Sequence, residues 1–583
     1  MAPHRTLLVA SVAAALAACD TPAGPNSGTV CNPDGQTGSV LSMSVGDVET
    51  VSSPADLACL RIQGSAEASR YLFVPANVTD RQDVRVSATF KASESEAASA
   101  TQLAMSLGGV PLVGADRPAR RSMSIDDRIR AFERTAEFRR GLENRRLRPT
   151  SRGARFSVSA AVAPTVGSTK TIRVPNFDDD TPTLCDNPIS IITTVKAVGE
   201  NSVILVDDNA PANGLSDADY TEIAAEFDTL IFPVDTTYFG VPSDLDVDER
   251  IYILYTPEVN KLSEPNSGSY VGGFFFSGDL FDAQDCAQSN ETEIFYLLAA
   301  DPGPNPLYGN KFEADFIRVS TRGTIAHEFQ HMINIGVKIA APFLAYDETA
   351  WLNEGLSHFA EELVGRRALN RGVLDELTWA QVYADRNTYI AFFYQNFARF
   401  EDYLLSPGSS SPTSEKAAEA LSYRGAAWAF VRHLADHRSG GDVDAFTRAL
   451  VLSPDTGIAN TESRTGVSFE EQIRGWLIAN AADDRGVPNL APVYEYASWR
   501  LIDAMECFAS DNPSVSCTSY PLKVTSLGSV PTTGSRLSIL SGSGAYYLGA
   551  YSGSTPTITV QLIGNTGQQL TAEGARIFVL RMD

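Results

Sequence analysis

The stretch TIAHEFQHMI, residues 324–333, contains two of the six histidines in a chain of 583 residues. His327 and His331 are four residues apart, so on a helix both imidazoles lie on one face, one turn from each other. The flanking sequence favours a helix, because apolar residues recur at helical spacing and Ser320 or Thr321 can serve as the N-cap. Two imidazoles on one helix face are typical of a zinc site, although such a pair can also simply pack or face solvent.

Glu328 follows the first histidine directly. A carboxylate beside two metal ligands that is not itself a ligand can act as general base on water, so we predict Glu328 as the catalytic base. Catalytic zinc takes three protein ligands and keeps one position open. A histidine six residues after His331 is ruled out, because Val337 stands there. Glu354, in ETAWLNEGLSHFAEELVG, lies 23 residues after His331 on a second predicted helix and completes a His₂Glu set.

The segments AHEFQHMI and WLNEGLSHFAEEL resemble those of gluzincin metallopeptidases, and they are most similar to the hyicolysin-type neutral metalloendopeptidases of that clan. FGVPSDLDVDERIYILYTPEVN and SYRGAAWAFVRHLADH resemble flanking segments of the same group, so the resemblance covers roughly residues 162–481. It implies a thermolysin-like catalytic domain with a mixed-sheet half and a helical half around a cleft. It also implies zinc bound by His327, His331 and Glu354, with Glu328 as the base.

The same resemblance bears on the kind of peptidase and on one further catalytic residue. The aminopeptidase branch of the clan holds the substrate amino terminus with a G-x-M-E-N strand. This motif is absent from the sequence, and its absence favours an endopeptidase. Gluzincins often supply a tyrosine from a downstream helix to the transition-state oxyanion. We predict Tyr423, in LSYRGAAWAF, in this role, and the alternative is a tyrosine of the core.

Other polar residues near the predicted ligands are harder to assign. His358 follows Glu354 by one helical turn, where a carboxylate that orients a ligand imidazole is usual; Glu361 or Glu362 could do that instead. His433 and His437 also have helical spacing, but no carboxylate motif accompanies them, and we predict a solvated helix face.

An acidic row precedes one predicted strand. Asp244, Asp246 and Asp248 alternate in SDLDVDER, as in the first half of a calcium loop. The central glycine and the later ligands of an EF-hand are missing, so an acidic turn is the simpler interpretation and Ca²⁺ a second one beside Zn²⁺.

The overall charge and the amino terminus indicate where the protein acts. A net charge of −25 argues against nucleic acid as a partner. Residues 1–19 read as a signal peptide, and its ending LAAC resembles a lipobox, which implies cleavage before Cys19 and lipid on its sulfur. Ordinary secretion is the alternative. We expect a monomer that contacts the membrane only through this anchor, with protein or peptide as substrate.

Six further cysteines are an even number in an exported chain, which is consistent with disulfides. Pairing between neighbours in the sequence gives three bonds: Cys31–Cys59, Cys185–Cys286 and Cys507–Cys517.

The pattern along the chain predicts an α+β, multidomain protein. An Arg-rich segment with thirteen arginines between residues 117 and 155 interrupts the sequence, and it reads as a solvated helix with a thin apolar stripe of Ile129, Phe132 and Phe138. TEIFYLLAAD is predicted to be an edge strand that aligns substrate. The predicted parts are a β-rich domain at 20–115, a helical linker or pro-junction at 116–160, the zinc metallopeptidase at 161–505 and a β-sandwich-like domain at 506–583.

Two other functions stay open. A surface binding or adhesion lipoprotein can use a peptidase scaffold without turnover, although such a protein has no need of the base Glu328. An aminopeptidase requires a free substrate amino terminus.

Overall fold

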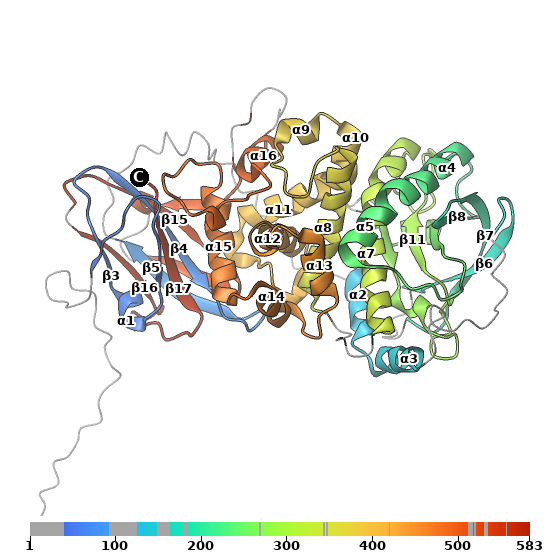
Figure 1. The fold of residues 1–583 in the computed structure, drawn as a ribbon, viewed down its shortest axis with the longest axis horizontal. Coiled ribbons are helices and arrows are strands. Elements are labelled where there is room, and N and C mark those ends of the chain that lie inside the picture. The colour runs from blue at the N-terminus through green and yellow to red at the C-terminus, as the bar shows by residue number, and fades with distance from the viewer. Residues whose placement is uncertain are drawn as a thin grey trace, which may run out of the picture.

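The elements of the chain form three parts in a row: a β-sandwich, a central group of helices, and a six-stranded sheet covered by helices (Figure 1). The mixed helix-and-sheet, multidomain class predicted from the sequence is therefore confirmed. The computed structural model describes residues 40–92, 125–147, 164–178, 184–266, 270–341, 344, 348–418, 420–510, 517, 520–529, 534–555 and 557–583.

The six-stranded sheet has the order β10-β11-β9-β8-β7-β6. Strands β8, β9 and β11 run parallel in its middle, and every residue in them is buried, which explains why their sequences are almost continuously apolar. The other strands pair antiparallel. The bounds are β6 (Thr169–Val174), β7 (Ile189–Val198), β8 (Ser202–Asp207), β9 (Ile251–Thr256), β10 (Gly273–Phe275) and β11 (Ile294–Leu298).

The edge strands of this sheet are β10 and β6, and the prediction that TEIFYLLAAD forms an edge was wrong. That segment forms β11, which lies between β9 and β10 and is hydrogen-bonded on both sides. The sequence misled because β10 has only three residues and starts at a glycine, so it does not read as a separate strand.

Two long helices follow the sheet. Helix α7 (Ala314–Ala340) contains both histidines of the motif, and α8 (Ala350–Ala368) contains Glu354. Helix α7 begins before the predicted caps, since its N-cap is Glu313, and the Thr321 hydroxyl donates to the Ile317 carbonyl inside the helix at 2.7 Å. The other helices of this region are α4 (Asp217–Glu226), α5 (Phe232–Phe239), α6 (Pro257–Asn260), α9 (Trp379–Tyr383), α10 (Arg386–Phe392), α11 (Tyr394–Leu405), α12 (Leu421–Arg438), α13 (Val443–Val451), α14 (Gly457–Thr465), α15 (Phe469–Ala482) and α16 (Leu501–Phe508).

The β structure at the two ends of the chain forms one sandwich, not the two flanking domains predicted. One sheet has the order β1-β3-β16-β5-β13 and the other β12-β15-β4-β17-β2, so both sheets contain strands from the amino-terminal and the carboxyl-terminal ends of the chain. The apolar side chains between the sheets come from both ends, for example Phe73, Phe90 and Ile577. The bounds are β1 (Val40–Leu41), β2 (Val48–Val51), α1 (Pro54–Ala58), β3 (Leu60–Gln63), β4 (Ser69–Asn77), β5 (Arg85–Ala92), β12 (Val524–Ser526), β13 (Ser535–Leu540), β14 (Ser543–Gly544), β15 (Tyr546–Tyr551), β16 (Thr557–Ile563) and β17 (Ala575–Arg581).

One sheet of the sandwich is buried on both faces. Its outer face packs on the helices, where the Tyr546 hydroxyl donates to the Leu477 carbonyl of α15 at 3.0 Å. The side chains of Leu72 and Phe578 belong to the large apolar core of the helical part, whereas their neighbours Phe73 and Ile577 belong to the sandwich core. This double burial ties the sandwich to the helices that carry the site.

The Arg-rich segment is packed against the protein. It forms α2 (Ile125–Glu133) and α3 (Ala136–Arg146), and the predicted stripe of Ile129, Phe132 and Phe138 is buried at 7%, 0% and 1% exposure. The prediction of a solvated linker was wrong, because aromatic rings of the sheet part, outside this segment, complete the environment of the stripe.

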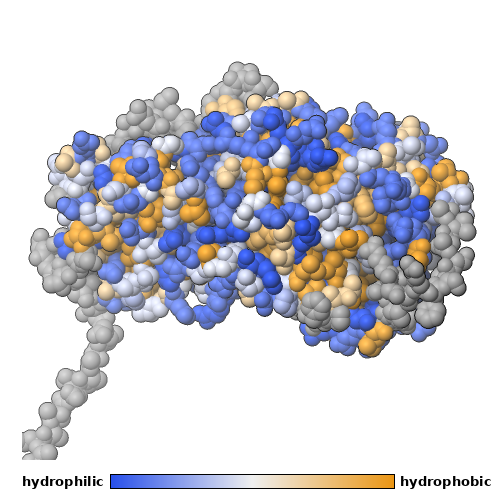
Figure 2. All heavy atoms as spheres, in the orientation of Figure 1, coloured by the Kyte–Doolittle hydropathy of each residue, from blue (hydrophilic) through white to orange (hydrophobic). Residues whose placement is uncertain are grey.

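Two of the three predicted disulfides are confirmed, Cys185–Cys286 and Cys507–Cys517. Cys59 is disulfide-bonded, and its predicted partner Cys31 lies outside the described residues. Hydrophilic residues cover much of the visible face, between smaller apolar patches (Figure 2). Among the described helices, none has both the length and the apolar character needed to cross a membrane.

The interleaved sandwich predicts the effect of truncation. A chain that ends at Lys523 lacks β15 and β17, the two neighbours of β4, so residues 40–92 should lose amide hydrogen-exchange protection by at least about tenfold. Exchange measured by mass spectrometry checks this. Unchanged protection of these residues would mean that the amino-terminal strands form an independent domain.

Candidate active site

Helix α7 directs His327 and His331 to one point. Their Nε2 atoms lie 3.2 Å apart, and the ring centroids are separated by 4.8 Å. Most of α7 is buried against the sheet and α8, including Phe329, Met332 and Ile333. The apolar residues of the motif therefore fix the helix, and the two imidazoles face its partner α8.

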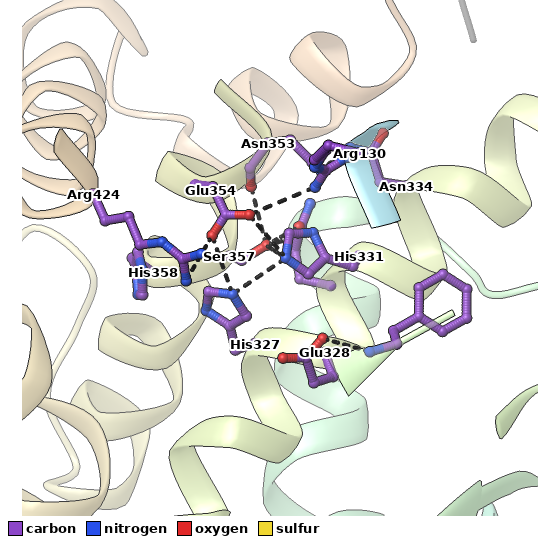
Figure 3. Close-up of polar contacts among 12 residues, drawn as sticks. Arg130, His327, Glu328, His331, Asn334, Asn353, Glu354, Ser357, His358 and Arg424 are labelled. Carbon is purple, nitrogen blue, oxygen red and sulfur yellow. Dashed lines mark hydrogen bonds and ion pairs between the residues drawn. The ribbon is translucent and has the colours of Figure 1, made fainter. Parts of the chain in front are cut away.

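Helix α8 brings Glu354 to the same point (Figure 3). Glu354 Oε2 lies 3.5 Å from His327 Nε2, and Oε1 lies 3.7 Å from His331 Nε2. One ligand atom from each of these three residues falls within 4.8 Å of the others. The His₂Glu set predicted from the sequence is thus brought together by the packing of α7 on α8.

Buried charges in the cluster favour a cation there. Burial by itself raises the pKa of Glu354, but the Arg424 guanidinium and the two imidazoles outweigh it and hold the pKa well below its usual range. Burial lowers the pKa of His327, but its contacts with Glu354 and Glu361 outweigh burial and raise the pKa to about 10. Glu354 Oε2 is buried and accepts no hydrogen bond from the protein. Two imidazoles and an ionised carboxylate fit a zinc ion, which on binding would displace the proton that His327 otherwise holds.

Glu328 lies beside the three candidate ligands but outside their set. Its Oε2 accepts a hydrogen bond of 2.9 Å from the Phe275 backbone N–H of strand β10, and 7% of the residue is exposed. The edge of the sheet therefore orients this carboxylate toward the cleft in which the ligands lie (Figure 3).

Glu361 is the carboxylate that orients the His327 imidazole. His327 Nδ1 donates to Glu361 Oε1 at 2.8 Å, and His358 Nδ1 donates to the same oxygen at 2.7 Å. His358 therefore shares the carboxylate that holds His327, and its ring lies 4.5 Å from the His327 ring, centroid to centroid. Of the two acids that the sequence left open, Glu362 instead belongs to a buried network with arginines and indoles of the helical part, namely Arg366, Trp428, Arg432 and Trp499.

Arg424, and not its neighbour Tyr423, reaches the cluster of His327, His331 and Glu354. The Tyr423 hydroxyl donates to the Ser409 carbonyl at 3.3 Å, whereas Arg424 Nη1 lies 3.3 Å from Glu354 Oε2. Successive residues of a helix point about 100° apart, so α12 turns Arg424 and not its neighbour toward the carboxylate. Sequence reasoning missed Arg424, whose only signal was its place next to the predicted tyrosine.

A second arginine reaches Glu354 from the opposite side (Figure 3). Arg130 of α2 has Nη2 at 3.6 Å from Glu354 Oε1, and its side chain is 14% exposed. With the Asn353 amide turned so that its oxygen faces the guanidinium, that oxygen accepts from Arg130 Nη1 at 2.7 Å. No motif around Arg130 signals this contact, because it depends on how α2 packs.

The cleft beside the ligands is large and rich in aromatic side chains. It has a volume of about 880 Å³ and is bounded on one side by β10 and on the other by α10 and α11. Its lining includes His327, Glu328, Tyr270, Gly273, Trp379, Tyr383, Tyr389, Tyr394, Arg399 and Arg424. A segment of extended peptide fits such a space.

The acidic row before β9 is bonded within the protein. The three carboxylates of Asp244, Asp246 and Asp248 lie together. Thr292 donates to Asp246 at 2.8 Å and the Tyr252 hydroxyl to Asp248 at 2.7 Å. These bonds fit an acidic turn, and Ca²⁺ stays a prediction from the sequence.

The second histidine pair is not a solvated face, as predicted. His433 is buried at 2% exposure. Its Nε2 donates to the Val493 carbonyl at 2.9 Å, and His437 Nε2 donates to the Glu495 carbonyl at 2.7 Å. The sequence could not indicate this, because the carbonyls come from a segment some sixty positions later in the chain.

The chain is similar in part to known metallopeptidases. The neutral metalloprotease ShpI of Staphylococcus hyicus is 30% identical over 179 residues, which are 31% of this chain and 37% of that protein. The chain thus matches little more than a third of the length of this curated relative. No protein-family model matches the sequence.

Two solved structures show a weaker likeness. The M1 zinc metallopeptidase from Deinococcus radiodurans has a TM-score of 0.26 at 14% identity over 53% of this chain and 51% of that one. A two-domain M1 zinc metallopeptidase variant bound to L-arginine has a TM-score of 0.26 at 13% identity over 55% of this chain and 53% of that one. Scores of this size do not establish a shared fold.

The cluster predicts how metal binding responds to substitution. Wild-type protein should hold about one zinc per chain, and His331→Ala and Glu354→Gln should hold little, because two remaining ligands form a weak site. Metal analysis after dialysis checks this. His437→Ala is the matched control, since it belongs to the other histidine pair, and it should keep full zinc. Full occupancy in His331→Ala would contradict the ligand set.

Proposed function

We propose that this protein is a zinc-dependent endopeptidase. The observation that carries the proposal is the convergence of His327, His331 and Glu354 at the wall of a cleft, with Glu328 beside them and outside the ligand set. Similarity to a curated neutral metalloprotease supports peptides as the substrate class.

Glu328 is proposed to move the proton in this reaction. A zinc ion in the site supplies a positive charge that acidifies water and polarises a peptide carbonyl. Glu328 takes the proton from the water as the water attacks the carbonyl carbon, and it then gives the proton to the leaving amine. Its hydrogen bond from the Phe275 N–H holds one carboxylate oxygen in place, so the side chain needs no reorganisation during the transfer.

Strand β10 is proposed to align the substrate. The Phe275 N–H donates to Glu328 and so points away from β11. Backbone groups two residues apart in a strand face the same side, so those of Gly273 face the cleft as well. An extended peptide can pair with this edge and bring its carbonyl to the ligands.

The oxyanion needs a donor besides the metal. Tyr423 is the candidate from the sequence, and Arg424 is the candidate from the geometry, because its guanidinium already lies beside Glu354. We propose that Arg424 carries the larger share. The guanidinium also keeps Glu354 ionised, which is the form of the carboxylate that can be a metal ligand.

Export and anchoring belong to the same proposal. Two disulfides fit an oxidising compartment outside the cytosol. The signal peptide and the lipid anchor on Cys19 lie outside the described residues and rest on the sequence, as does the expectation of a monomer.

Hydrolysis of an internally quenched peptide with a blocked amino terminus, with and without a chelator, tests the proposal. An endopeptidase cuts the blocked peptide and stops on chelation. An aminopeptidase cuts only the unblocked peptide. Zinc binding without hydrolysis of any peptide or unfolded protein would favour the binding or adhesion lipoprotein.

Replacing the base should separate chemistry from metal binding. Glu328→Gln should keep zinc and the fold but lose about 100- to 10,000-fold in kcat, because the amide cannot accept the proton of the water. Peptide hydrolysis and metal analysis on the same sample check this. If activity stays within about threefold of wild type, another group is the base.

The two oxyanion candidates can be told apart by paired variants. We expect Arg424→Lys to lower kcat by about 10- to 100-fold with little change in KM, since a contact made only in the transition state appears in kcat. Tyr423→Phe should lower kcat less, because its hydroxyl bonds Ser409. A larger loss of kcat in Tyr423→Phe would return the role to the tyrosine.

A further inference from the structure

The Arg-rich segment of α2 and α3 is built into the side of the catalytic part. Phe132 packs on Phe276, directly after β10, with 5.2 Å between ring centroids, and Phe138 packs on Phe281 at 5.2 Å. The rings of Phe132 and Phe138 are fully or almost fully buried. These contacts place α2 along the same edge strand that holds Glu328.

Polar contacts fix the segment at its middle and near its carboxyl end. Arg146 donates from Nε and Nη2 to the Lys338 carbonyl in the last turn of α7, at 3.0 and 2.7 Å. A cation at this place satisfies a carbonyl that the helix leaves open. Asn144 donates to Asp285 at 2.8 Å, and Arg134 forms an ion pair with Glu415 at 2.9 Å. These contacts therefore give the segment a fixed position on the protein.

In this position the segment closes one side of the candidate active site. Between α2 and the ligands there remains a cavity of about 20 Å³, lined by Ile129, Arg130 and Glu133 together with Glu328, His331 and Glu354. Such a volume holds about a single water and no peptide side chain. Beyond Arg130 and Glu133 a second cavity of about 410 Å³ opens. The large aromatic cleft lies on the other side of the ligands, so α2 separates the two spaces from each other.

Arg130 adds an electrostatic block to the steric one. Its guanidinium lies 3.6 Å from Glu354, a proposed metal ligand (Figure 3). A guanidinium beside this carboxylate repels a second cation that approaches it, and the repulsion is stronger in a buried site than in water. The guanidinium thus competes with a metal cation for the same carboxylate.

The conformation of the segment explains why it blocks the site without being a substrate. Arg130 lies within the helix α2, whose backbone groups are hydrogen-bonded along the helix. A peptide that pairs with an edge strand must be extended, with its N–H and C=O groups available. The helical form therefore covers the ligands but cannot be aligned for cleavage.

We infer that the α2–α3 segment is an internal inhibitor of the proposed peptidase, with Arg130 against Glu354, and that displacing or cutting it opens the cleft on both sides of the ligands. The inference rests on the proposed function. It gives the Arg-rich segment a more definite role than the processing junction or linker that its sequence indicates.

The experiment compares the full chain with Arg130→Ala, Arg130→Lys and the control Arg140→Ala, whose side chain lies on the exposed face of the same helical hairpin. Two quantities are measured for each: the rate of zinc uptake by metal-free protein, and kcat/KM for an internally quenched, N-blocked peptide. Circular dichroism and thermal melting establish that each variant is folded.

We expect Arg130→Ala to raise both quantities by about 5- to 150-fold, the usual range of coupling between two sites. Arg130→Lys should lie between wild type and Arg130→Ala, since lysine keeps the charge but loses the planar fork. Arg140→Ala should match wild type.

The outcomes distinguish this inference from the proposed function. Faster zinc uptake in Arg130→Ala without peptide hydrolysis in any variant would keep the inhibitory contact and reject the peptidase. Hydrolysis by wild type with both quantities unchanged in Arg130→Ala would reject the inference. Equal effects of Arg130→Ala and Arg140→Ala would reject it too, because a general loosening of the hairpin would then explain the gain.

Discussion

The packing of α7 on α8 is the contact on which the rest of the structure depends. Helix α8 carries three buried carboxylates, two of which face α7, and a buried carboxylate is stable only when cations or hydrogen-bond donors face it. Glu354 faces two imidazoles and Arg424, Glu361 faces His327 and His358, and Glu362 faces two arginines and two indoles. A slip of α7 along α8 would separate Glu354 and Glu361 from the imidazoles of α7. The geometry of the site and the register of α7 against α8 therefore depend on the same contacts.

The sheet supplies the other wall of the site. The short strand β10 binds Glu328 through one N–H and keeps its outer edge toward the cleft. Because β10 pairs with the buried parallel strands β8, β9 and β11 through β11, the carboxylate is fixed by the backbone of a rigid element and not by a loop. This arrangement suits a group that has to exchange protons at a constant position.

The sandwich shares an extensive apolar interface with the helices and closes the chain on itself, since its strands come from both ends. The Arg-rich hairpin contributes no strand and is held by two aromatic contacts and a few polar ones. An element held in this way can separate from the protein without unfolding the sheets, as the inferred inhibition requires.

The sequence by itself determined the features that depend on neighbouring residues. Helical spacing places His327 and His331 on one face, the same period places Glu354 and Glu361 on one face of the next helix, and pairing between neighbouring cysteines gave two correct disulfides. Only the tertiary structure decided which strands share a sheet, that Arg424 and not Tyr423 turns toward Glu354, and that Arg130 lies against the ligands. These contacts join residues that are tens to hundreds of positions apart in the chain. Local periodicity carries no information on such pairs, because the free energy that selects them comes from burying whole surfaces together.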